Sequence, residues 1–296
     1  MTRKTARDFH PDVLALFDQY VHGAIQRGDF LRMAGKYAVA GATAETLLNA
    51  LSPKFAEAAQ TQESDPRIRV SRVEYASPFG SGKVRAYMAR PAKASGKLPT
   101  VLVVHENRGL NPHIEDIARR LAVDNFIAFA PDALTPLGGY PGDEEKAVAL
   151  FGKLDQNKTR NDFLAAAAYL KALPDGNGKV GVVGFCWGGG IANFLATRVP
   201  DLAAAVPFYG AQPSAEDTAK IKTPLLIHYA GNDTRIDAGW PAYEAALKAA
   251  HVRYQEYTYP GVEHGFNNDT TPRYDAAAAK LAWDRTIAFF NANLRG

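Results

Sequence analysis

Short apolar runs alternate with amphipathic segments from about residue 100 to the C-terminus. The runs typical of buried strands are 100–104, 126–130, 179–185, 203–209, 224–229 and 254–259. The segments with helical spacing are 113–124, two helices between about 143 and 173, 188–199, 240–250 and about 273–293. This alternation predicts an α/β fold with a mostly parallel sheet covered on both faces. In such a sheet the ligand-binding and catalytic residues lie at the carboxyl ends of the strands.

The N-terminal part has a different pattern. Val13, Leu14, Leu16 and Phe17 lie on one face of a helix, and helical spacing continues to about residue 60. The polar segment 61–68 contains a proline and is typical of a linker. Residues 1–65 are therefore expected to form a helical arm and linker, and residues 66–296 one catalytic domain. That domain should begin with an antiparallel hairpin, 70–75 with 84–89, at a sheet edge.

Composition and charge narrow the classes of function. The 296 residues are 47% hydrophobic and 22% charged, which is ordinary for a globular protein. The formal net charge of +3 is spread along the chain, so nucleic acid is not an expected partner. The chain has one cysteine, so it cannot form an intramolecular disulfide, and a reducing, cytoplasmic location is the default. No cofactor and no metal ion are expected.

The sequence contains no run of about 20 apolar residues, so we do not expect a membrane partner. The segment Met33 to Leu51 is rich in alanine and follows Arg27-Gly28-Asp29-Phe30-Leu31, which faintly resembles a twin-arginine export signal. The second arginine is missing, and Lys36 and Glu45 interrupt the apolar part. An amphipathic helix of the arm is the preferred interpretation, and a periplasmic location is the alternative.

The sharpest local motif surrounds the single cysteine. Gly184-Phe185-Cys186-Trp187-Gly188 matches the nucleophile elbow G-x-nucleophile-x-G, with cysteine in the place of serine. It lies where a predicted strand ends and a predicted helix begins, as that motif requires. The start of a helix also favours the thiolate over the thiol. A lone cysteine is more often a packing residue, but this context predicts that Cys186 is a nucleophile.

A nucleophile of this kind needs a base and an acid that orients the base. Asp233 follows the strand 224–229, and His264 follows the strand 254–259, in the chain order nucleophile, acid, histidine. Asp237 follows the same strand as Asp233 and is the alternative acid; Glu263 is expected to be exposed. The other histidines are assigned to the arm (His10, His22), to helices (His113, His251) and to a strand interior (His228).

The segment His105-Glu106-Asn107-Arg108-Gly109 follows the strand 100–104. In this type of fold the corresponding loop donates a backbone N–H to the oxyanion, so we expect the N–H groups of Asn107 and Trp187 to stabilise it. Glu106 could accept the thiol proton or hold the thiol at rest. Glu106 and Arg108 could instead form a structural ion pair at the strand end.

Together these residues resemble the dienelactone hydrolase family, also called carboxymethylenebutenolidases. The resemblance covers about residues 70–295 and includes Pro207-Phe208-Tyr209-Gly210 and His264-Gly265-Phe266. It implies an α/β-hydrolase fold, a Cys186, Asp233 and His264 triad, and Glu106 as the acid that holds the resting thiol. Well-studied members bind the carboxylate of dienelactone with arginines, one of them shortly after the catalytic histidine. Here residues 265–269 contain no arginine, and neither do residues 132–158. Arg108, Arg235 and Arg273 could bind a substrate carboxylate from other sides of the site.

The expected reaction is the opening of a carboxylic ester or lactone through a thioester on Cys186. Arg108, Tyr140, Tyr209 and Phe266 are candidate substrate-binding residues, although such aromatics are equally typical of a core. The alternatives are a broader esterase or phosphotriesterase, and a scaffold that binds a small molecule without catalysis. A thiol redox protein would need a second cysteine. The apolar face of the arm suggests a homodimer.

Overall fold

The computed structural model describes residues 4–38 and 43–295. Within them, eight strands form one sheet in the order β1-β2-β4-β3-β5-β6-β7-β8. The strands are β1 (Ile68–Ser77), β2 (Gly82–Pro91), β3 (Leu98–Val104), β4 (Ile127–Pro131), β5 (Gly176–Phe185), β6 (Ala204–Phe208), β7 (Leu225–Ala230) and β8 (Tyr254–Tyr259). β3 to β8 pair in parallel, while β1 and β2 form an antiparallel hairpin at one edge. This is an α/β-hydrolase fold, as predicted.

Helices cover both faces of the sheet. The principal ones are α5 (Pro112–Val123), α6 (Glu144–Phe151), α7 (Gln156–Lys171), α8 (Trp187–Arg198), α11 (Trp240–Ala249) and α12 (Ala276–Leu294). The short helices α9 (Ala215–Thr218) and α10 (Thr234–Asp237) follow β6 and β7. Because side chains alternate along a strand, β3 sends Val101 and Val103 into the core under α5 and α12, and Leu102 and Val104 into the core under α7, α8 and α11.

The order of the strands positions the site. From β3 the chain passes to β4 on one side, and it returns to β5 on the other side of β3. This reversal leaves a crevice at the carboxyl ends of β3 and β5, where open α/β sheets bind ligands. The loop that contains residues 105–109 and the residue that follows β5, Cys186, both lie at this crevice.

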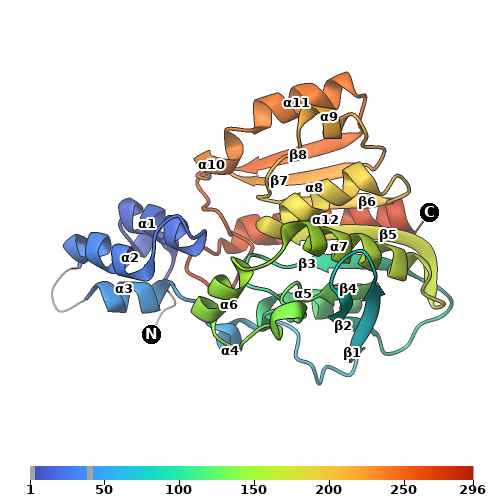
Figure 1. Cartoon of the computed structure of the whole chain (residues 1–296), viewed down its shortest axis with the longest axis horizontal. Helices are drawn as coiled ribbons and strands as arrows, with labels where there is room; N and C mark the ends of the chain where they lie inside the picture. Colours follow the sequence, from blue (N-terminus) through green and yellow to red (C-terminus); the bar gives the residue numbers. More distant parts are fainter. Residues whose placement is uncertain (1–3, 39–42, 296) are drawn as a thin grey trace.

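The N-terminal helices gather off this end of the sheet (Figure 1). They are α1 (Pro11–Val21), α2 (Arg27–Ala34) and α3 (Ala44–Leu51), and α4 (Phe55–Ala58) leads from them to the catalytic part. Their apolar side chains form a small core of their own, which includes Phe17, Phe30 and Leu51. The arm thus buries its apolar face in its own core. The homodimer expectation was based on that face and gains no support from it.

The arm also includes the segment Met33 to Leu51, which was considered as an export signal. Residues 39–42 of Met33 to Leu51 lie outside the described residues, and the rest of it forms the end of α2, a 3₁₀ helix (Gly35–Tyr37) and α3. None of the described helices combines the length and apolar character needed to cross a membrane.

Candidate active site

Cys186 occupies a sharp turn between β5 and α8. Its φ of 56° and ψ of −115° are unusual for a residue other than glycine, and such strain is typical of functional positions. The turn depends on its glycines because the backbones approach closely: a methyl group on Gly184 would overlap the carbonyl of Gly188, and one on Gly188 would overlap that of Val104. The elbow predicted from the sequence is therefore present, with the thiol at the first turn of α8.

Asp233 and His264 form a hydrogen-bonded pair beside the elbow. Asp233 Oδ2 contacts His264 Nδ1, and Asp233 Oδ1 accepts a hydrogen bond of 3.3 Å from the backbone N–H of Ile236 at the start of α10. A carboxylate held in this way fixes the orientation of the imidazole and favours the proton on Nδ1. His264 Nε2 is buried and has no hydrogen-bond partner among the described residues. Of the two candidate acids, Asp233 is the one paired with His264.

The charges of this group favour a thiolate. Burial by itself raises the pKa of the Cys186 thiol, but His264 and then His22 outweigh it and lower the pKa to about 5. Burial likewise disfavours protonated His264, whereas the thiolate and Asp233 raise its pKa to about 10. Between these values the sulfur is ionised and His264 is protonated.

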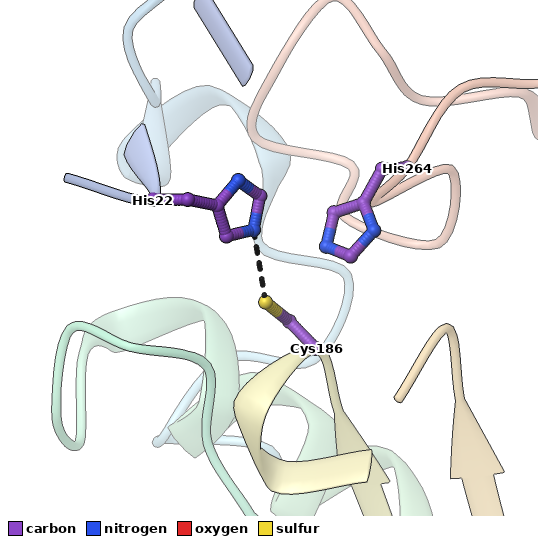
Figure 2. A group of neighbouring side chains, drawn as sticks. All are labelled: His22, Cys186 and His264. Atoms are coloured by element: carbon purple, nitrogen blue, oxygen red, sulfur yellow. Dashed lines mark hydrogen bonds between the residues drawn. The ribbon is translucent and has the colours of Figure 1, made fainter. Parts of the chain in front are cut away.

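The arm supplies a residue that the sequence analysis set aside. His22 Nε2 lies 3.4 Å from Cys186 Sγ, and the His22 ring lies beside the His264 ring next to the sulfur (Figure 2). Its ring lies 4.8 Å from the His264 ring, measured between centroids. Its Nδ1 donates a hydrogen bond of 2.7 Å to the backbone carbonyl of Asp18 and lies 3.3 Å from Asp18 Oδ1. His22 directly follows α1, so α1 ends at the nucleophile.

Several contacts dock α1 on the catalytic part. The Val21 carbonyl accepts hydrogen bonds from Asn107 Nδ2 at 2.7 Å and from Arg108 Nη1 at 3.1 Å. Asp18 Oδ1 lies 3.3 Å from Arg273 Nη1, whose guanidinium lies over the Phe17 ring. The loop expected to bind the oxyanion therefore holds the residue that precedes His22.

The arm and the catalytic part enclose a cavity of about 270 Å³. Cys186, His264 and Glu106 line it from the catalytic part, and Phe17, Tyr20 and His22 line it from the arm. Cys186 is 8% exposed. A substrate in contact with the sulfur would therefore also contact the arm.

The predicted residues of the β3 loop lie at this cavity, but their contacts differ from those expected. Among the described residues, Glu106 Oε2 accepts a hydrogen bond of 2.9 Å from Asn268 and makes none with the thiol. Arg108 pairs with Glu144 at 3.2 Å rather than with Glu106. Trp187 is the first residue of α8, where backbone N–H groups have no partner within the helix. Its side chain stacks on His105 and donates to Gln156 at 3.2 Å.

None of the candidate aromatic residues lines the cavity at Cys186: one lines a second cavity, and the other two are buried in the core. Tyr140 lines another cavity, beside Arg85 and Asp132, and its hydroxyl contacts Glu144 at 2.8 Å. Phe266 is fully buried in the core. Tyr209 is also buried, has a φ of 37° and packs its ring 4.9 Å from that of His264.

The histidine and the two acids considered as alternatives to His264 and Asp233 do not belong to the triad and make other contacts. His228 lies inside β7, between Thr286 and the Tyr259 hydroxyl, and burial lowers its pKa to about 3. Asp237 is not paired with the histidine, and burial raises its pKa to about 6. Glu263 is half-buried and accepts a hydrogen bond from Asn232.

The donor atoms of His22, Cys186 and His264 lie within 4.8 Å of one another. One thiolate and two imidazoles are suitable ligands for a thiophilic ion such as Zn²⁺. Carboxylates behind the imidazoles are equally common at metal sites, whereas a cysteine held in a strained strand-to-helix elbow is typical of a nucleophile.

Comparison with known proteins shows the family of the chain. Residues 84–294 match the model of the dienelactone hydrolase family, and residues 1–39 match that of a YqhI-like family. A Salmonella typhi protein named "Putative carboxymethylenebutenolidase" is 32% identical over 254 residues, which cover 81% of this chain and 94% of that protein.

Solved structures extend the similarity to three dimensions. A Klebsiella pneumoniae protein described as a "Putative Dienelactone Hydrolase" is 30% identical with a TM-score of 0.65, over 75% of this chain and 98% of that one. A dienelactone hydrolase-like promiscuous phosphotriesterase from metagenomic libraries is 25% identical with a TM-score of 0.67, over 77% and 99%. The chain is thus an ester hydrolase by family, and it belongs to the dienelactone hydrolase family.

Proposed function

We propose that the chain hydrolyses small carboxylic esters or lactones through a thioester on Cys186, with His264 as base and Asp233 as the acid that orients it. The observation that carries this proposal is the placement of the strained Cys186 next to the His264–Asp233 pair. The low pKa of the thiol, about 5, supports it because the thiolate is the nucleophile.

In the first half of the reaction, the Cys186 thiolate attacks the carbonyl carbon. The oxygen that gains the negative charge is stabilised by the backbone N–H groups of Trp187 and Asn107. A donor of this kind contributes about 3 kcal/mol. The carbon–oxygen bond to the alcohol then breaks, an imidazolium beside the sulfur gives its proton to the departing oxygen, and the acyl group remains as a thioester.

In the second half, His264 takes a proton from water, and the water oxygen attacks the thioester carbonyl. Its unpartnered Nε2 is the atom for this step. The carbon–sulfur bond breaks, the acid leaves, and the sulfur departs as thiolate. Loss of the thiolate charge in the thioester removes the main influence that holds a proton on His264, so the ring can act as a base at this stage.

The cavity favours an uncharged substrate. It is small, at about 270 Å³, and its arginines already face acids: Arg108 faces Glu144 at 3.2 Å, and Arg273 faces Asp18 at 3.3 Å. A carboxylate without an available cation is costly to bury. We therefore propose neutral esters or lactones as substrates, rather than the anionic dienelactone.

The first experiment compares the wild type with Cys186→Ala and with His251→Gln, an exposed histidine away from the site, as control. Wild type and control should hydrolyse p-nitrophenyl acetate with the same kcat/KM, and Cys186→Ala should lose the activity. Dienelactone should be the poorer substrate for the wild type. An active Cys186→Ala variant would exclude the thiol nucleophile.

A phosphotriesterase is the second candidate, supported by the structural neighbour that is described as one. Paraoxon turnover that depends on Cys186 and exceeds that of acyl esters would favour it. If no ester is turned over, the interpretation as a binding scaffold takes precedence. A cytoplasmic location, a homodimer and the absence of a nucleic-acid partner remain predictions.

A further inference from the structure

Two histidines lie side by side next to Cys186 Sγ (Figure 2), and each of them is accompanied by an aspartate. Asp233 contacts His264 Nδ1, and Asp18 faces His22 Nδ1. The second pair comes from α1 of the arm, 164 residues away along the chain. A histidine that only filled space at this position would not need a carboxylate behind its ring.

The two rings do not make the same contacts with the sulfur. His22 Nε2 lies 3.4 Å from Sγ and 3.2 Å from Arg235 Nη2, whereas His264 Nε2 belongs to the same cluster but makes no hydrogen bond with the described residues. The acceptors around His22 Nδ1, which are the carbonyl and the carboxylate of Asp18, fix a proton on that nitrogen. Of the two neighbours of His22 Nε2, Arg235 can only donate, so a proton on Nε2, which makes His22 an imidazolium, is donated to the thiolate. After acylation removes the thiolate charge and His264 has lost its proton, His264 Nε2 is left for a water molecule.

We propose that His22 is a catalytic residue of this hydrolase: it protonates the departing alcohol oxygen, while His264 activates the water. This inference rests on the proposed thioester reaction and divides its acid and base roles between two histidines. Asp18 is a positioning residue, since it acts through the His22 ring. The arm therefore completes the active site in addition to covering it.

The protons balance over the cycle. The His22 Nε2 proton goes to the alkoxide as the carbon–oxygen bond breaks. Once acylation has removed the thiolate charge, His264 releases its proton to solvent and then receives one from the attacking water. The thioester yields the free acid and the thiolate, His264 is again protonated, and His22 takes up a proton from solvent, which restores the starting state.

The test uses His22→Gln, which keeps a polar side chain but cannot act as an acid. All acetate esters give the same acetyl thioester, so differences between them reflect the first half of the reaction. p-Nitrophenolate leaves as a stable anion and needs little protonation, whereas methoxide and ethoxide need a proton as they leave. General acid catalysis contributes about 10²- to 10⁴-fold, so kcat/KM for methyl and ethyl acetate should fall ~100-fold or more, and that for p-nitrophenyl acetate only a few-fold.

His10→Gln is the matched control. His10 caps the start of α1, accepting a hydrogen bond from Asp12, and is exposed. This variant loosens the same helix without changing a group at the sulfur. It should lower kcat/KM only slightly, and by the same factor for all the esters. In His22→Ala, added imidazole should restore part of the methyl acetate turnover.

The outcomes separate this inference from the proposed function. If His22→Gln lowers the turnover of all acetates by the same factor, or of none, His22 has no role as an acid and the inference is overturned. If Cys186→Ala retains activity, the thioester reaction itself fails. If Cys186 is required and the effect of His22→Gln grows with the basicity of the leaving group, both hold.

Discussion

Replacement of His264 by glutamine should shift the ionisation of the only thiol in the chain. The pKa of Cys186 is about 5: burial raises it, and His264 and His22 together lower it. The substitution removes one of these two lowering influences, whereas the burial remains. We therefore expect the pKa to rise toward the ordinary thiol value of about 8.5.

The size of the effect determines which quantity should be measured. At pH 7 a thiol with a pKa of about 5 is ~99% ionised, and one with a pKa of about 8.5 is ~3% ionised, a ratio of about 30. A thiolate of lower pKa is, however, a weaker nucleophile, with a Brønsted coefficient of about 0.4–0.5. Over ~3.5 pKa units this offsets most of the gain from ionisation. A rate at a single pH is therefore uninformative, and the midpoint of the pH profile is the quantity to measure.

Alkylation by iodoacetamide between about pH 4 and 10 gives that midpoint. The chain has one cysteine, so all of the signal comes from Cys186. The rate should rise with pH to a plateau as the thiol ionises, with its midpoint near 5 in the wild type and in His251→Gln, and well above it in His264→Gln. A wild-type midpoint near 8.5, or the same midpoint in His264→Gln as in the wild type, would refute the reasoning.

Three further predictions concern the acid, the helix at the elbow and the arm. In p-nitrophenyl acetate hydrolysis, Asp233→Asn should lower kcat about 10⁴-fold, as loss of the orienting acid does in other triads. The kcat of Asp237→Asn should stay within a few-fold of the wild-type value. Gly189→Ala places a methyl group 2.6 Å from a carbonyl oxygen of β6, whereas at Gly190 the nearest atom is 3.7 Å away. Urea unfolding should show Gly189→Ala destabilised by about 1–3 kcal/mol and Gly190→Ala unchanged or up to about 1 kcal/mol more stable; equal effects would contradict this packing. Phe30→Ala should cost the arm core about 3–5 kcal/mol, and limited proteolysis should then cleave the arm at a protease dose that leaves wild type intact.

Much of the fold follows from local sequence patterns. The parallel strands inside the sheet are apolar on both faces, so runs such as 126–130 and 203–209 stood out, and the structure places β4 and β6 there within one residue at each end. The short helices α9 and α10 have only four residues each, too few for a periodic pattern. The positions of Cys186, Asp233 and His264 could be predicted because each follows a strand end, and parallel strands end at the same edge of the sheet.

The contribution of the arm could not be predicted from these patterns. His22 reaches the sulfur because α1 docks on the β3 loop through Asn107 and Arg108, and no local periodicity encodes such a contact between distant segments. One signal was present in the sequence: Asp18 and His22 are four residues apart, the spacing that brings side chains together on a helix. Tyr140 differs from its expected place because its loop turns toward Asp132, whose carboxylate accepts the Tyr140 backbone N–H.

The most direct test of the central claim is to trap the acyl-enzyme. His264→Gln, mixed with p-nitrophenyl acetate and quenched in acid, should gain the mass of one acetyl group, and peptide mapping should place it on Cys186. The adduct should accumulate in this variant because deacylation lacks its base, and hydroxylamine should remove it as expected for a thioester. An acetyl group on any other residue, or turnover by Cys186→Ala at the wild-type rate, would contradict the account.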